Sequence, residues 1–562
     1  MDLDINLKDF LADESKEYDE LKVNSYDIIK LSNKSRYTND IVRNAMNNKI
    51  IPFPRFDSFN LHSNDDWNTV NDKYGKSYQL YIHTLRFVNE LLLQYVDTKE
   101  KKYLDKAERF IEKWIVYASK PKVSKMVWYD HSAAQRTQVL LYFVYLSQNT
   151  KGFDKNKYGR LLEFHGIFLA EDAVYHRTNH GLMMDRSIMT LGIVLGNEPL
   201  FNYGYFRSID TFWYSFSSKG LHLENSPGYH NMVVKMYRQI ESFLHKNDKS
   251  YGEVVNSTLD KADEIKGLIT LPQEIMPNIG DTGNKVAQNK TSYENFVDYE
   301  GGLTIIQDEL NMLHATFISG YSSITHKHFD DLSFALMYKG LKFLEEAGRY
   351  NYSRHAYRKY VKSPQAHSGM YIVGEDYSLK KDNRFSRKVR IDYHIENENF
   401  FQVKGSHEDY EKADLSRQVI YLKKESIFII FDKVVSNGSV EVIHNYNLNK
   451  DVEVKNIQND SYLLSNNGVN ILLESHSEVD SSEIINGSLN IDNVIALNSP
   501  EYNEIEVTSQ IKFHNKLEKN QEKTNVFTLS ENNENRTTTI KYDSVKHLLK
   551  INVNEEIYYI NL

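Results

Sequence analysis

His326 and His328 lie two residues apart in the segment THKHFDDLSF, residues 325–334. The pair comes just ahead of an expected strand, and on an extended backbone side chains at i and i+2 share one face. One imidazole can then bind a metal ion while the other points into a neighbouring site, or both can bind the ion. Because such a pair is equally typical of structural or exposed histidines, it needs other polar groups nearby to indicate a site.

Those polar groups occur in order along the chain. The segment EEAGRY (345–350) follows the same expected strand pair, and His367 lies beyond it in SPQAHS (363–368). Earlier segments are GLHLENSPGYH (220–230), TNHG (178–181) and WYDH (128–131), the last followed by Arg136. Together these motifs, from about residue 75 to 370, resemble the heparinase II/III-like family. The tyrosine segment and the HxHxD segment carry most of the resemblance, because each motif alone is weak.

The resemblance implies a polysaccharide lyase built from a toroid of helical hairpins, (α/α), followed by a large antiparallel β-sandwich. It assigns the chemistry to three residues, which are Asn179, Tyr229 and His326. The residues expected to bind substrate are Trp128, His131, Arg136, His180 and Glu224. A divalent ion, zinc or a similar metal, is expected to brace the site through His328, Glu346 and His367. The family pattern usually has Asp where this chain has Glu346, which changes the reach of that ligand.

The chemistry of elimination agrees with these residue types. A lyase must remove the C5 proton of a uronate, so it needs a group that neutralises the adjacent carboxylate and stabilises the enolate. Asn179, helped by His180 or Arg136, is the candidate for that role. The alternative is that Asn179 only caps a helix that begins at His180.

Tyr229 also has two interpretations. It is in helical phase with Val233, Met236, Ile240 and Phe243, which predicts a core tyrosine. The resemblance instead makes it the proton donor to the leaving O4, in the first turn of a helix capped by Ser226. His326 suits a base, because imidazole is a side chain that can accept a proton without much tuning. If the proton and the leaving oxygen lie on one face of the sugar, Tyr229 alone could act as both acid and base.

The two halves of the chain differ in hydrophobic period, which predicts the domain boundary. The first half has helical runs at about 76–96, 104–118, 131–148, 155–173, 180–195, 226–246 and 254–268. From about residue 301 the period shortens to two, as in Val389, Ile391, Tyr393 and Ile395. We therefore predict a helical lead-in (1–70), a toroid (71–295) and a β-sandwich (296–562), with a connector at about 270–300 in which the residues around Asp281 form a turn.

Composition limits the class of protein. The formal net charge of -9 argues against a nucleic-acid binder, although it leaves room for a local basic cleft. The absence of cysteine excludes disulfides and thiol catalysis. No apolar run is long enough for a membrane span. The first residues, MDLDINLKDF, lack the features of an export signal, so a cytoplasmic protein is expected if Met1 is native, and a secreted or cell-surface one if a signal was removed.

The leading hypothesis is a lyase that acts on an acidic, glycosaminoglycan-like polysaccharide. The first alternative is a glycoside hydrolase, which would need paired carboxylates across a cleft, such as Asp130 and Glu224. The second is a glycan-binding protein that has the fold without the activity. The sequence does not indicate an oligomeric state.

Overall fold

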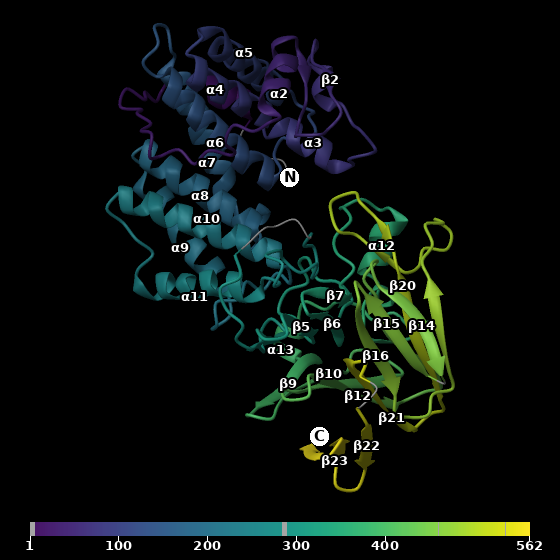
Figure 1. The fold of residues 1–562 in the computed structure, drawn as a ribbon. Helices are drawn as coiled ribbons and strands as arrows, with labels where there is room; N and C mark the ends of the chain where they lie inside the picture. Colours follow the sequence, from purple (N-terminus) through teal and green to yellow (C-terminus); the bar gives the residue numbers. More distant parts are fainter. Residues whose placement is uncertain (1–5, 284–288, 459, 534–535) are drawn as a thin grey trace. The chain divides into compact units, whose positions relative to one another are not determined.

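The chain is helical up to Ile269 and mostly composed of strands from Phe296 onward in a computed structural model (Figure 1). The structure describes residues 6–283, 289–458, 460–533 and 536–562. Two compact units divide the chain, the first being Met1–Ser215 with Lys235–Asn256 and the second Phe216–Val234 with Ser257–Leu562. The predicted fold class, helices followed by antiparallel sheets, is confirmed. The domain limits given above remain predictions.

The first unit consists of helices that pack in consecutive pairs, such as α4 with α5 and α8 with α9. The stripe of α5 is buried as expected, since Leu104, Ala107, Ile111 and Trp114 are each at most 4% exposed. The helices of the first part of the chain are α1 (Leu7–Ala12), α2 (Thr38–Met46), α3 (Lys76–His83), α4 (Arg86–Thr98), α5 (Lys101–Ala118), α6 (Asp130–Ser147), α7 (Lys155–Ala170), α8 (Asn179–Val194), α9 (Glu198–Ser215), α10 (Pro227–Lys246) and α11 (Glu253–Ile269), with the 3-10 turns η1 (Asp65–Asn68) and η2 (Asp172–Val174) and the short strands β1 (Lys49–Ile50) and β2 (Phe59–Asn60).

The helix expected over residues 76–96 is in fact two helices. The break lies at Leu85, whose φ of 56° is left-handed. The hydroxyl of Thr84 donates to the carbonyl of Tyr81 and accepts from the N–H of Arg86, so a side chain replaces helical bonds at this point. No helix among the described residues is long and apolar enough to cross a membrane.

The second unit contains sheets whose named strands all pair antiparallel. An eight-stranded sheet has the order β14-β15-β16-β21-β12-β11-β10-β9, a four-stranded sheet β17-β20-β13-β8, and a five-stranded sheet β3-β4-β5-β6-β7. A three-stranded sheet, β22-β23-β24, ends the chain. The HxH motif therefore precedes the second-last strand of the five-stranded sheet.

The bounds of the strands from Phe296 onward are as follows. The strands are β3 (Phe296–Asp298), β4 (Leu303–Asp308), β5 (Leu313–Ile318), β6 (Ser333–Tyr338), β7 (Leu341–Leu344), β8 (Met370–Ile372), β9 (Val389–Glu396), β10 (Phe400–His407), β11 (Ala413–Leu422), β12 (Ile427–Ser436), β13 (Val440–Asn447), β14 (Glu453–Gln458), β15 (Ser461–Asn466), β16 (Val469–Ser475), β17 (Ser481–Asn486), β18 (Leu497–Asn498), β19 (Glu506–Val507), β20 (Ser509–Leu517), β21 (Glu522–Glu531), β22 (Thr538–Asp543), β23 (Leu548–Val553) and β24 (Glu556–Asn561). Between them lie the helices α12 (Ala356–Lys362), η3 (Pro364–Ala366) and α13 (Asn383–Ser386).

Strand β12 has an unbroken apolar run because both of its faces are buried. Phe428 and Ile430 belong to the main core between the sheets, whereas Ile427, Ile429 and Phe431 pack on the far side against β23 and β24. The predicted alternation of β9 is only partly realised. Val389 and Ile391 are buried, but Ile395 is 44% exposed because β9 is the edge strand of its sheet.

Candidate active site

Tyr229 and His326, two of the three predicted catalytic residues, are in direct contact within the second unit. Their rings are stacked with centroids 3.5 Å apart and an interplanar angle of 21°. The Tyr229 hydroxyl forms a 2.8 Å hydrogen bond with the hydroxyl of Tyr352. The sequence had placed His326 on extended backbone, and this is wrong, because its φ of 58° puts it in a turn ahead of β6. A phenol and an imidazole are thus brought together.

Asn225 joins the two segments that carry these rings. Its amide donates to the carbonyl of Ser323 at 2.7 Å and to that of Thr325 at 3.0 Å. Gly280 allows this close approach, because a Cβ there would lie 2.3 Å from the carbonyl oxygen of Asn225 and 2.9 Å from that of His326. The contact between phenol and imidazole therefore depends on backbone packing from three segments.

The helix start that carries Tyr229 is fixed by the connector. Helix α10 begins at Pro227 as predicted, with Ser226 just before it. The oxygen that accepts the N–H of Gly228 belongs to Thr282, at 3.0 Å, and Thr282 also hydrogen-bonds the Ser226 hydroxyl at 2.7 Å. A distant threonine therefore does the capping that the sequence assigned to Ser226.

Asp281, which the sequence suggested was only a turn residue, contacts two histidines and an arginine at the site. Its Oδ2 lies 2.8 Å from Nδ1 of His326, and its Oδ1 lies 3.1 Å from Nε2 of His328 and 2.6 Å from Nη1 of Arg358. Burial alone would raise the pKa of Asp281, but the hydrogen bonds from both histidines and the charge of Arg358 hold it well below its usual value. An ionised carboxylate only accepts hydrogen bonds, so Nδ1 of His326 carries its proton.

This tautomer leaves Nε2 of His326 with a lone pair, as a base requires. The carboxylate of Glu224, which is 3% exposed, lies 3.6 Å from that nitrogen. An imidazolium formed by proton uptake would therefore lie between two carboxylates. Glu224 was predicted to bind substrate, and the structure places it beside His326.

Tyr229 is suited to donate a proton. Burial, followed by its contact with Tyr352 and the charge of Asp281, raises its pKa above the usual value, while Arg349 opposes the shift. The phenol is therefore protonated at neutral pH. The helical stripe of Val233, Met236, Ile240 and Phe243 is buried as predicted. Tyr229 continues this stripe in phase, but it is only partly buried and its ring lies on His326.

The predicted metal ligands lie close together without forming a recognisable metal site. The rings of His328 and His367 have centroids 5.6 Å apart. Glu346 Oε2 lies 2.5 Å from Nδ1 of His367, and Oε1 accepts from the hydroxyl of Ser333. Nδ1 of His328 and Nε2 of His367 are buried without hydrogen-bond partners, which suits metal ligation. Within the described ranges, however, no group of three His, Asp or Glu side chains could hold an ion.

A buried ion cluster anchors the loop of the HxH motif. Lys327 is fully buried and forms ion pairs with Asp330 and, at 3.0 Å, with Asp331. Asp331 also accepts from the N–H of Gly320 at 3.0 Å and from the hydroxyl of Tyr377 at 2.8 Å. Asp330, the Asp of the HxHxD pattern, and its neighbour Asp331 therefore both hold Lys327 inside this loop.

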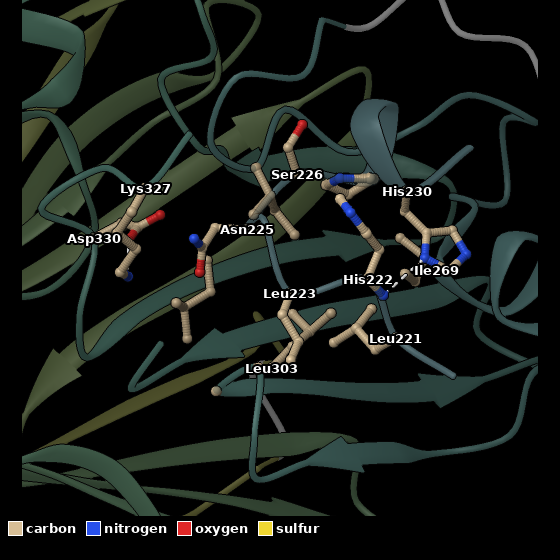
Figure 2. Close-up of a pocket in the computed structure, with 15 residues that line it drawn as sticks. Leu221, His222, Leu223, Asn225, Ser226, His230, Ile269, Leu303, Lys327 and Asp330 are labelled. Atoms are coloured by element: carbon tan, nitrogen blue, oxygen red, sulfur yellow. Dashed lines mark hydrogen bonds and ion pairs between the residues drawn. The ribbon is translucent and has the colours of Figure 1, made fainter. Parts of the chain in front are cut away.

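A small apolar pocket lies beside the site. Figure 2 shows it between Lys327 and Asp330 on one side and His222 and His230 on the other, over Leu221, Leu223 and Leu303. The N–H of His222 donates to Nδ1 of His230 at 3.1 Å. None of the predicted catalytic residues lines the pocket, so it belongs to the core under the segment 221–230.

The third predicted catalytic residue, Asn179, belongs to the first unit. It is 8% exposed and is the first residue of α8. The capping residue is Thr178, whose hydroxyl accepts from the N–H of His180 at 3.2 Å. The interpretation that Asn179 only caps this helix is therefore wrong.

The predicted substrate-binding residues of the first unit divide into two groups. His131 and His180 are partly exposed, with ring centroids 4.7 Å apart, and Nδ1 of His180 lies 3.4 Å from Asp130. Arg136 is instead fully buried, 4.1 Å from the ring centroid of Trp114. Its Nε donates to Nε2 of His165 at 2.9 Å.

Trp128 is partly exposed, and its ring packs against Phe164, Phe168 and His165. The structure thus gives Arg136 a packing role, because a substrate does not reach a side chain without exposed surface. The predicted contact of Arg136 with the glycan is corrected accordingly.

Two family models match the chain. "Heparinase II/III N-terminus" covers residues 9–301, and "Heparinase II/III-like, C-terminal" covers residues 299–542. No sequence among the curated proteins matches significantly.

Solved structures of lyases are similar to the chain in fold. Heparinase III is 13% identical with a TM-score of 0.77, covering 99% of this chain and 94% of that one. Heparan sulfate lyase HepC from Pedobacter heparinus is 14% identical with a TM-score of 0.68, covering 99% and 93%. Chondroitin AC lyase from Streptomyces coelicolor A3, in complex with chondroitin sulphate, is 9% identical with a TM-score of 0.57, covering 92% and 82%. At these identities the likeness shows the fold alone.

Proposed function

Because the chain belongs to the heparinase II/III family of polysaccharide lyases, we propose that it cleaves a uronic-acid-containing, glycosaminoglycan-like glycan by β-elimination. The observation that carries this proposal is the stacked pair of Tyr229 and His326. An imidazole whose Nε2 carries a lone pair and a phenol are the base and the acid that an elimination requires.

In the proposed reaction, Nε2 of His326 removes the C5 proton of the uronate. The electron pair forms the C4–C5 double bond, the C4–O4 bond breaks, and the Tyr229 hydroxyl gives its proton to O4. The raised pKa of Tyr229 favours it as the acid over a double role as acid and base. Asn179, and His180 with it, would neutralise the uronate carboxylate so that the C5 proton becomes more acidic.

A divalent ion, zinc or a similar metal, is part of the proposal. Nδ1 of His328 and Nε2 of His367 would hold it, with Glu346 as the group that orients His367. The ion would tie together the loops behind His326. It would not activate water, since an elimination consumes none.

A panel of acidic polysaccharides tests the proposal directly. Glycosaminoglycan chains should give rising ultraviolet absorbance from the 4,5-unsaturated uronate, more readily than alginate-like chains. New reducing ends without that absorbance would indicate a hydrolase and contradict the proposal. Binding without any cleavage would instead indicate a glycan-binding protein.

A further inference from the structure

Tyr352 connects the partly buried phenol of Tyr229 to the surface. The two hydroxyl oxygens are 2.8 Å apart, and Tyr352 is 48% exposed. Its ring also stands edge-on to His326, with centroids 6.4 Å apart. Tyr352 follows the EEAGRY segment, and the sequence gave it no role. It is therefore a titratable group that touches the proposed acid and has its own access to water.

The proposed elimination leaves the site in the wrong protonation state after each turnover. His326 has gained the C5 proton, and Tyr229 has lost the proton that it gave to O4. A phenolate regains its proton at its oxygen. His326 covers one face of the Tyr229 ring beside that oxygen. In the structure that hydroxyl is hydrogen-bonded to Tyr352.

We propose that Tyr352 is a proton relay that restores Tyr229 between turnovers, an inference that rests on the proposed lyase function. As Tyr229 gives its proton to O4, the Tyr352 hydroxyl donates a hydrogen bond to the phenolate oxygen and then transfers its proton to it. The phenolate of Tyr352 takes a proton from water or a buffer acid, and His326 releases the C5 proton to solvent. One proton leaves and one enters, so the cycle balances.

The charges around Tyr352 fit both of its states. Burial and the charge of Asp281 raise its pKa, so the phenol is protonated and ready to donate at neutral pH. Arg349 and Arg358 oppose the shift, and the guanidinium of Arg358 lies 5.4 Å from the ring centroid. The charges of both arginines would stabilise the phenolate that exists for part of each cycle.

The test is Tyr352→Phe, which keeps the ring and removes the relay hydroxyl. We expect kcat to fall by about a hundredfold, within the range for a positioned acid or base, with KM little changed. Small buffer acids should restore part of kcat in proportion to their concentration, and the solvent deuterium isotope effect on kcat should rise. Tyr350→Phe is the matched control, because Tyr350 lies in the same turn but packs against His355 and Tyr357.

Three results would overturn the relay. A wild-type kcat in Tyr352→Phe would exclude the relay and leave the proposed lyase function standing. A loss of kcat that buffer acids do not restore, with an unchanged isotope effect, would make Tyr352 a positioning residue only. A wild-type protein that forms no unsaturated product from any acidic glycan would reject the lyase proposal itself and the relay with it. Thermal unfolding of both variants should match wild type, which separates these outcomes from misfolding.

Discussion

The phenol ring of Tyr229 lies face to face with the imidazole of His326, at a centroid separation of 3.5 Å. Stacking fixes both rings, so the hydroxyl and Nε2 can be presented together to one sugar. The segments that carry the rings lie far apart in sequence, and they are joined by the amide of Asn225 and by the connector residues Gly280, Asp281 and Thr282.

Removing only the hydroxyl of Tyr229 should separate packing from chemistry. We expect Tyr229→Phe to lose turnover by about a hundred- to ten-thousandfold, because an acid that protonates O4 is gone. The free energy of unfolding should change by at most about 0.5–1.5 kcal/mol, the value of one hydrogen bond. Activity on a glycan that the wild type cleaves, with urea unfolding alongside, measures both. Near-full activity would mean that another group protonates O4.

Asp281→Asn should weaken the base without removing it. The amide keeps the shape of the side chain but loses the charge that holds Nδ1–H of His326. We expect turnover to fall by roughly tenfold to a hundredfold, as when a carboxylate that orients a functional histidine is removed. Glu300→Gln is the matched control, since its carboxylate accepts only from Ser218 at the surface. Equal activities of the two variants would mean that Asp281 serves folding alone.

The sequence pointed to Tyr229 and His326 but not to Asp281, which lies between His326 and His328. Tyr229 and His326 could be selected as candidates because motifs of distinctive residue types surround them. Asp281 could not, because an Asp in the segment NIGDTG is typical of an ordinary turn, and only the fold shows that it meets two histidines and Arg358. Tyr352 was missed for a similar reason, since tyrosine is abundant in this chain.

The fold class was predictable because periods of 3.6 and two residues persist over long segments. Local departures from these periodic patterns could not be predicted from the sequence. The break at Leu85 depends on the hydroxyl of Thr84, and the turn at His326 replaces an expected extended segment. Helix α9 was not predicted at all, because aromatic residues occur on its exposed side, including Phe206 and Trp213, and obscure the apolar stripe.

Metal content tests the proposed ion. We expect about one divalent ion, zinc or similar, per chain by elemental analysis, with loss of the ion in His328→Ala and His367→Ala. A chelator should lower the unfolding temperature of the wild type and have no further effect on either variant. Metal-free wild-type protein whose unfolding temperature ignores the chelator would remove the ion from the proposal, and His328 and His367 would remain buried packing residues.

A buried ion pair in the sandwich should make stability depend on acid pH. Asp432 and Arg417 are both fully buried and joined by two hydrogen bonds of 2.6 and 2.7 Å. Burial alone would raise the pKa of Asp432, but Arg417 and His444 hold it below its usual value. Because the folded pKa is lowered, this stabilisation is fully present above the unfolded pKa of about 3.9 and is lost as pH falls through the folded value.

Asp432→Asn should therefore cost about 3–5 kcal/mol at neutral pH, because it leaves the Arg417 charge buried and unpaired. The difference from wild type should shrink as the pH falls below about 4, because the carboxylate of the unfolded wild-type chain then takes up a proton before the folded one, whose pKa is lowered, does so. Urea unfolding at neutral and acid pH measures this. The exposed pair of Lys424 and Glu556 supplies the control, and Glu556→Gln should change stability little at either pH. A difference for Asp432→Asn that is constant with pH would contradict the assignment.

Neighbouring residues at the start of α8 separate a structural role from a catalytic one. Thr178 provides the capping oxygen, and Asn179 is the buried first residue of the helix. Thr178→Ala should lose about 0.5–2 kcal/mol of stability, as caps usually do, and retain turnover. Asn179→Ala should unfold cooperatively near the wild-type midpoint yet lose turnover by about a hundred- to a thousandfold, because the uronate carboxylate then loses the main group proposed to neutralise it. If instead Asn179→Ala keeps its activity, the carboxylate must be bound by another group, and His180 is the next residue to test.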